Sequence, residues 1–149
     1  MQTIEVLSAL AHIATALAVG VAAFQLRAAH KQSITSFEDS LTKEYREVAS
    51  NLPLKALLGE SLEDREHQDH LKYFYRYFDL CNEQAFLHKV GRISDPTWKF
   101  WQDGILTNLR RPAFARAWCE IAHRANDDFS ELRAICSPED EFFHHSTDA

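Results

Sequence analysis

The chain of 149 residues carries 16 basic and 22 acidic side chains, and its net charge of −6 argues against a general nucleic-acid coat, which needs a basic surface. Its four glycines and four prolines leave few turns for a sheet, so we expect an all-α protein. The three cysteines, Cys81, Cys119 and Cys136, are odd in number and lack metal-ligand spacing. We expect reduced thiols packed as small apolar side chains.

Residues 6–26, VLSALAHIATALAVGVAAFQL, contain no charged side chain. A bilayer core of roughly 30 Å needs about 20 helical residues, so the stretch predicts a transmembrane helix. Arg27, His30 and Lys31 follow directly. By the positive-inside rule they place the N-terminus outside and the rest of the chain in the cytoplasm.

Two alternatives to this span stay open. A cleaved signal peptide begins with basic residues, whereas this chain begins MQTIE. A buried helix of a soluble domain is the other alternative, because Ser8, His12, Thr15 and Gln25 dilute the apolar run. The predicted organisation is an anchor over 1–31, a helical cytosolic domain over 32–137 and a flexible tail over 138–149.

Ser8, His12 and Thr15 fall on one face of the predicted span, together with small residues. A single span has no internal partner for a polar stripe, so we expect a homo-oligomer formed through this face. His12 has two interpretations. It is either a neutral imidazole that hydrogen-bonds within or between helices, or part of a titratable ring that lines a pore.

The membrane helix is expected to continue without a break to residue 50, since no glycine or proline interrupts 27–50. Its stripe of Ile34, Phe37, Leu41, Tyr45 and Val48 should pack on the chain's own domain. Proline, glycine and capping signals then predict a short helix at 54–58 and longer helices at about 61–90, 95–110, 112–125 and 129–136. The 61–90 helix is expected to begin with a capping box formed by Ser61 and Asp64, and the 95–110 helix with Ser94 as its N-cap.

An acidic and histidine-rich segment lies at the start of the 61–90 helix. Its His67 and His70 are three residues apart and could share a cation with Glu63 or Glu66. Acidic residues also suit a helix N-terminus, so a solvated face is the favoured interpretation. His144 and His145 in the tail carry little weight.

The basic residues of the domain concentrate around Trp118. They are Arg110, Arg111, Arg116, His123 and Arg124, which Lys89 and Arg92 could join in space. Such a cluster predicts either a site for a phosphate or other anionic ligand, or surface ion pairs with nearby acids. The neighbouring aromatic stretch at 73–78 is expected to be mostly core, although Tyr73 and Tyr77 could flank a ligand.

The segment from Tyr73 to Trp118 resembles a group of uncharacterised bacterial single-span membrane proteins with a small all-helical cytosolic domain. The matching positions are Phe74, Phe78, Glu83, Gly91, Ile93, Trp98, Trp101, Pro112, Phe114 and Trp118. The resemblance implies the same layout in a bacterial inner membrane, and that group has no established activity to transfer. The layout is also similar to small membrane effectors of anti-phage systems, including those gated by cyclic oligonucleotides in type III CRISPR signalling.

No nucleophile-elbow, zinc-protease, P-loop or dinucleotide motif occurs in the sequence. We therefore expect a non-enzymatic, oligomeric membrane protein without a cofactor, whose helical domain senses a ligand such as a cyclic oligoadenylate and acts on the membrane. The alternative is a membrane-tethered scaffold that binds a protein partner. A metal-dependent enzyme around His67 and His70 is a third and minor hypothesis.

Overall fold

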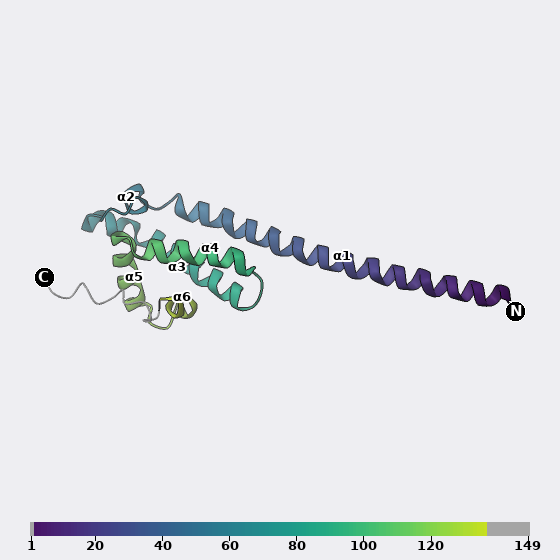
Figure 1. Ribbon diagram of the computed structural model, residues 1–149. Helices are drawn as coiled ribbons and strands as arrows, with labels where there is room; N and C mark the ends of the chain where they lie inside the picture. Colours follow the sequence, from purple (N-terminus) through teal and green to yellow (C-terminus); the bar gives the residue numbers. More distant parts are fainter. Residues whose placement is uncertain (1, 137–149) are drawn as a thin grey trace. The chain divides into compact units, whose positions relative to one another are not determined.

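The computed structural model describes residues 2–136, with side chains from residue 12 onward, and contains six helices and no strand over that range (Figure 1). The all-α prediction is therefore confirmed for this part of the chain. The helices are α1 (Gln2–Ala49), α2 (Leu54–Leu57), α3 (Asp64–Lys89), α4 (Asp95–Leu109), α5 (Pro112–Arg124) and α6 (Ser130–Ile135). The chain divides into two compact units, 1–37 and 38–149, which are described separately below.

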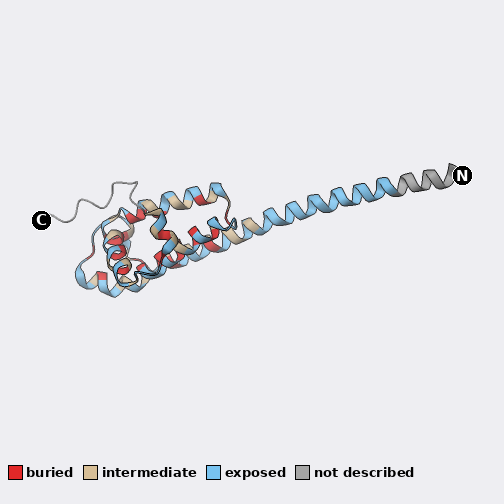
Figure 2. Cartoon of the chain, turned by 90° about the horizontal axis from the view of Figure 1, so that it is seen from below, coloured by how far each residue is buried: buried red, intermediate tan, exposed pale blue. Residues whose placement is uncertain are grey.

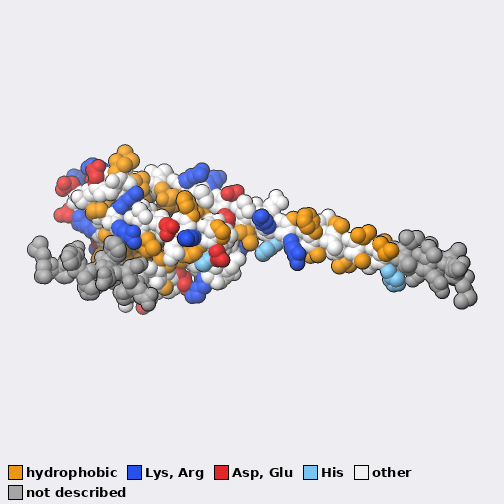
Figure 3. Space-filling model, in the orientation of Figure 1, with side chains coloured by type: hydrophobic (Ala, Val, Ile, Leu, Met, Phe, Trp, Pro, Cys, Tyr) orange, Lys and Arg blue, Asp and Glu red, His pale blue; other side chains and the backbone are white. Residues whose placement is uncertain are grey.

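The first unit is the N-terminal part of α1, which runs without a break as predicted. Every side chain from residue 12 to residue 33 is exposed (Figure 2), although many of them are apolar (Figure 3). The large exposed ones are Ile13, Leu17, Val19, Val21, Phe24 and Leu26. Within the described residues, α1 is the one helix long and apolar enough to cross a membrane.

The second unit is built around α3, which contacts α4, α5 and α6. Its core holds Phe74, Tyr77 and Phe78 of α3 against Phe114 of α5, all of them buried. Phe114 meets Phe74 and Tyr77 edge to face, with ring centroids 5.1 and 5.2 Å apart. Such aromatic pairs stabilise the core beyond the area that they bury.

The C-terminal turns of α1 belong to this core, because Leu41 and Val48 are buried and the Tyr45 ring contacts Tyr77. This confirms that the stripe packs on the chain's own domain from Leu41 onward.

The capping box predicted at Ser61 and Asp64 is wrong. Helix α3 begins at Asp64 after Glu63, and no side chain caps it. Ser61 instead lies in the extended segment before the helix, where it is exposed. Gly59 ends the turn after α2 with a left-handed φ of 87°, and Glu63, directly before α3, is extended.

Ser94 precedes α4 as predicted, but a different residue completes the cap. The Glu38 carboxylate of α1 accepts the Ser94 backbone N–H at 2.8 Å and the Thr97 hydroxyl at 3.0 Å. In a capping box the third helical residue supplies that carboxylate. Here the third residue is Thr97, and Glu38 provides the missing group from 56 residues earlier.

The cysteine prediction is only partly right. Cys81 is fully buried in the core, and burial raises the pKa of its thiol to about 12. Cys136 is partly buried, and burial raises its pKa to about 11. Cys119 is exposed, because it lies on the face of α5 opposite the buried Ala117 and Ile121. It is therefore not a packed side chain.

Candidate functional site

A groove of about 640 Å³ opens in the second unit and is lined by the last turns of α1, the middle of α3 and most of α4. Its size is within the usual range for small-molecule sites. Buried side chains form its floor and exposed ones its rim. The lining residues are Thr42, Tyr45, Arg46, Tyr77, Gln84, Phe100, Trp101, Asp103, Gly104, Ile105, Thr107, Asn108 and Arg111.

A short chain of hydrogen bonds runs from the floor of the groove to its rim. The buried Asn108 donates from Nδ2 to the Tyr77 hydroxyl at 2.8 Å, and its Oδ1 accepts from Arg111 Nη1 at 2.7 Å. These two bonds fix which side of the Asn108 amide is donor and which is acceptor. Arg111 keeps further N–H groups beyond the one given to Asn108.

The Tyr77 hydroxyl stays protonated in this environment. Burial is the main cause that raises the pKa of Tyr77 well above its ordinary value, and the neighbouring Cys81 adds to the rise. The hydrogen bond from Asn108 acts in the opposite direction and is the weaker influence. The buried polar side chains of the groove, Tyr77, Gln84 and Asn108, are therefore uncharged.

Gln84 is the second buried amide of the groove and differs from Asn108 in its contacts. Only 3% of its surface is exposed, and among residues 12–136 its side-chain amide has no hydrogen-bond partner. Among the described residues, His67 Nδ1 is the one fully buried side-chain N or O atom without a partner, so the Gln84 amide keeps some contact with solvent. Since Gln84 lines the groove, its amide can be reached there by a ligand or by water.

The five residues of the predicted basic cluster lie in different surroundings. Arg111 lines the groove. Arg116 pairs with Asp64 at 2.8 Å and also contacts the Leu62 carbonyl. Arg110 is the exposed residue directly after α4. The described contacts thus bring one of the five to the groove, and anion binding by the cluster stays a prediction.

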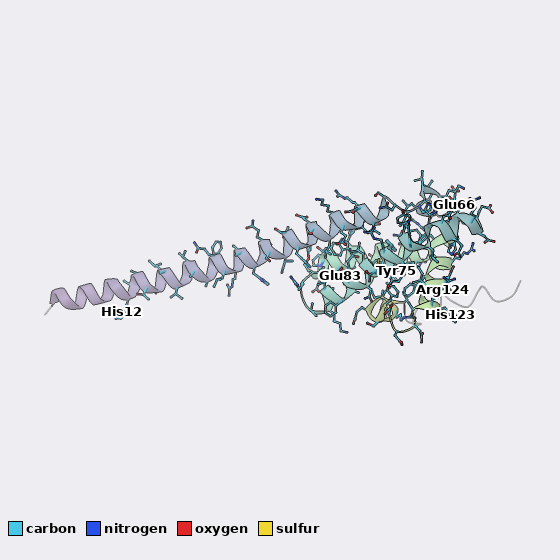
Figure 4. The ribbon with its side chains drawn as sticks, turned by 180° about the vertical axis from the view of Figure 1, so that it is seen from behind. His12, Glu66, Tyr75, Glu83, His123 and Arg124 are labelled. Atoms are coloured by element: carbon cyan, nitrogen blue, oxygen red, sulfur yellow. The ribbon has the colours of Figure 1, made fainter. Side chains whose placement is uncertain are left out.

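His123 and Arg124 lie at the C-terminal end of α5 (Figure 4). Arg124 pairs with Glu120 at 2.7 Å, and His123 is exposed. Arg124 and Tyr75 of α3, both labelled in Figure 4, also belong to the lining of a smaller hollow, and this hollow has a volume of about 370 Å³. That hollow is shallow and almost wholly apolar apart from its two cations, Lys72 and Arg124.

The solvated face predicted around His67 is wrong for His67 itself. Its ring is fully buried, and Nε2 lies 2.8 Å from the Glu120 carboxylate of α5. His70 Nδ1 lies 2.8 Å from the Glu66 carbonyl one turn back in the same helix. The two imidazoles are therefore engaged in separate contacts, and no group of three metal-ligating side chains occurs in the described part of the chain.

His12, labelled in Figure 4, lies in the exposed apolar part of α1. Thr15 lies in the same part, whereas the Ser8 side chain is outside the described residues. The oligomeric stripe therefore stays a prediction. The tail at 138–149, with His144 and His145, is also outside the described residues.

Sequence analysis missed Gln84 and Asn108. The available signal was a polar residue on an apolar stripe. Gln84 continues the α3 face of Tyr77 and Cys81, at spacings of four and three, and Asn108 adjoins the buried Leu109 of α4. A lone amide in such a stripe is easily mistaken for a surface residue at the helix edge.

No protein-family model, no curated protein and no solved structure matches this chain.

Proposed function

We propose that this chain is a membrane-anchored, oligomeric sensor that binds a small ligand in the groove and acts on the membrane without catalysing a reaction. The observation that carries the proposal is the exposed apolar part of α1. Transfer of one large apolar side chain out of water is favourable by about 1.5–3 kcal/mol. Insertion of the six large exposed side chains of α1 into lipid would therefore stabilise the protein substantially.

The charges beyond the apolar segment support a cytoplasmic domain. Arg27 and Lys31 follow the segment, and both are exposed. Cations at this position favour the cytoplasmic side of a membrane helix. Under this proposal, Ser8, His12 and Thr15 form the contact between subunits in the bilayer.

The composition of the groove supports binding over catalysis. Among its lining residues, Asp103 is the one carboxylate, and there is no histidine, lysine, serine or cysteine. Threonine and tyrosine hydroxyls also line the groove, but a hydroxyl nucleophile needs an adjacent base, and within the described residues no hydrogen bond joins one of them to Asp103. Neutral amides, aromatic rings and two guanidinium groups are instead typical of a site that recognises a ligand.

The ligand that we propose is a cyclic oligonucleotide, and the proposed role of the protein is in anti-phage defence. The alternative is a tethered scaffold that binds a protein partner. That alternative is favoured by Leu54 and Leu58, which are both exposed and lie four residues apart at α2. An apolar pair of this kind suits a protein contact.

The test is leakage from liposomes that contain the full-length protein. The liposomes enclose a self-quenched dye, and cyclic oligoadenylates are added outside and inside. A sensor that acts on the membrane releases dye when a ligand is present. It also gives a defined oligomer in detergent by light scattering coupled to size-exclusion chromatography.

The variant Arg110→Glu with Arg111→Glu is expected to lose the response, because it reverses the charge at and beside the groove. Its matched control is Lys43→Glu with Lys99→Glu, which makes the same charge change at two exposed positions outside the groove lining. A monomer that leaves the liposomes intact with every ligand would contradict the sensor proposal and favour the scaffold.

A further inference from the structure

The groove also indicates which class of ligand it binds, an inference that rests on the proposed ligand-binding function. The first indication is the unpaired Gln84 amide on the floor. A primary amide presents one acceptor and two donors in a plane. It pairs best with a planar edge that carries a donor beside an acceptor, as the edges of nucleobases do.

A second amide with a fixed orientation lies on the same floor. Because Asn108 already bonds to Tyr77 and Arg111, one of its N–H groups and one carbonyl lone pair remain for a ligand. Gln84 and Asn108 come from different helices, α3 and α4, and both line the groove. Two amides can both hydrogen-bond to one edge of a nitrogen heterocycle.

Aromatic side chains stand around these amides. Tyr45 and Trp101 are half-buried, and Phe100 is 78% exposed although it lies beside the groove. An exposed phenylalanine ring makes no stabilising contact with water. A nucleobase that stacks on such a ring stabilises the complex by about 1–3 kcal/mol.

The rim carries the charge that an anionic group would need. Arg46 is exposed at the α1 side, and Arg111 has spare donors at the α5 side. Arginine binds phosphate and carboxylate through two parallel hydrogen bonds. Asp103 also lies at the rim, and its carboxylate suits a ring N–H or a sugar hydroxyl rather than the anion.

We propose that the groove binds a nucleotide-like ligand. Its nitrogen heterocycle hydrogen-bonds to Gln84 and Asn108 and stacks on the aromatic side chains, and its anionic arm lies against Arg46 and Arg111. The volume of about 640 Å³ has room for one nucleotide unit, either free or as part of a larger molecule.

The test is isothermal titration calorimetry of the full-length protein in detergent. The probes are AMP, GMP, CMP and UMP, with ribose 5-phosphate as the probe that lacks the ring and adenosine as the probe that lacks the phosphate. At least one nucleotide is expected to bind, and the two partial probes are expected to bind about tenfold more weakly or less.

Gln84→Met keeps the side-chain volume and removes the amide, so it is expected to weaken nucleotide binding by about tenfold. Gln68→Met is its matched control, because it makes the same change at an exposed position of α3 outside the groove. Phe100→Ala is a second variant that removes only an exposed ring, and it tests the site even where Gln84→Met fails to fold.

The inference is overturned if no nucleotide binds, if ribose 5-phosphate binds as tightly as the nucleotides, or if both Gln84→Met and Phe100→Ala leave binding unchanged. Nucleotide binding without dye release from liposomes leaves this inference standing and contradicts the proposed action on the membrane. Dye release by a ligand without a ring supports the proposed action on the membrane and contradicts the inference of a nucleotide site.

Discussion

Glu120 is the residue at which several contacts of the second unit meet. Its carboxylate lies 2.8 Å from His67 Nε2, 3.4 Å from Gln68 Nε2 and 2.7 Å from the Arg124 guanidinium. The hydrogen bond from His67 is the largest cause that lowers the pKa of Glu120, and Gln68 and Arg124 contribute, while partial burial opposes them. Because the other imidazole nitrogen, Nδ1, is buried without a partner, the ring depends on Glu120 alone for a hydrogen bond within the described residues.

Replacement of Glu120 by alanine is expected to lower the free energy of unfolding by about 1–3 kcal/mol, since it leaves a buried imidazole N–H unpaired. The measurement is thermal unfolding followed by near-ultraviolet circular dichroism. Glu83→Ala removes an exposed carboxylate from α3 (Figure 4) and is expected to change stability little. Equal losses in both variants would contradict a special role for Glu120.

The same contact predicts how stability depends on pH. A carboxyl group whose folded pKa is lowered stabilises the fold above its unfolded pKa, and this stabilisation is lost as the pH falls through the folded value. We therefore expect the melting temperature to fall as the pH drops below the ordinary carboxyl range of about 4.5. In Glu120→Gln this acid-dependent part should shrink, and an unchanged slope would contradict the assignment.

The thiols differ in exposure by enough to separate their reactivity. Cys119 is exposed, whereas Cys81 is fully buried with a pKa raised to about 12. An alkylating reagent at pH 8 is expected to modify Cys119 in the folded protein and Cys81 only after unfolding. Peptide mass spectrometry over a time course measures both rates, and labelling of Cys81 as fast as Cys119 would mean that the core opens readily.

At the scale of the helices, the start of α4 depends on α1. Glu38→Ala is expected to destabilise the second unit by about 0.5–2 kcal/mol, the usual effect of a lost N-terminal cap. Thr97→Glu in the same chain should restore much of this stability, because the third helical residue then supplies the carboxylate of a local capping box. Thermal unfolding of the single and double variants measures the rescue. A double variant no more stable than Glu38→Ala would contradict the capping role.

Most helix bounds could be predicted because prolines and glycines mark them locally. Pro112 begins α5 as expected, and α3 ends before Gly91, whose φ is 74°. The start of α6 was predicted at Phe129 and lies one residue later, at Ser130, because Phe129 adopts a left-handed φ of 62°, which is unfavourable for a bulky residue. Its buried ring packs on Tyr75 and Trp118, so tertiary contacts hold a conformation that the local sequence disfavours.

For the whole molecule, the predictable part was the long apolar helix and the unpredictable part was the groove. An uncharged run of about 20 residues is visible in any one-dimensional profile. The groove depends on residues from three helices, as Tyr45, Gln84 and Trp101 illustrate, and their meeting is a property of the packed second unit. The sequence predicted a basic cluster from residues close in the chain, whereas the floor of the groove is formed by amides that are far apart in it.

The membrane proposal makes a prediction at this scale. Leu17→Lys with Val21→Lys places two charges in the apolar segment, each costing about 2.5–3.5 kcal/mol at the centre of a membrane helix. We expect the protein to shift from the membrane fraction to the soluble fraction after alkaline extraction. Leu54→Lys with Leu58→Lys is the matched control, since Leu54 is 69% exposed and Leu17 is 66% exposed. Equal partitioning of all three proteins would contradict a transmembrane role for α1.

The cap that α1 provides to α4 has a consequence for how this sequence can change over generations. Because the Glu38 carboxylate accepts the hydrogen bonds that a glutamate at position 97 would accept, Glu38 cannot be lost first without destabilising the start of α4. A descendant that gains a carboxylate at 97 is released from the need for one at 38, and the order of the two changes matters. Lineages should therefore pass through the form with both acids before the older one is lost, and the two positions should covary.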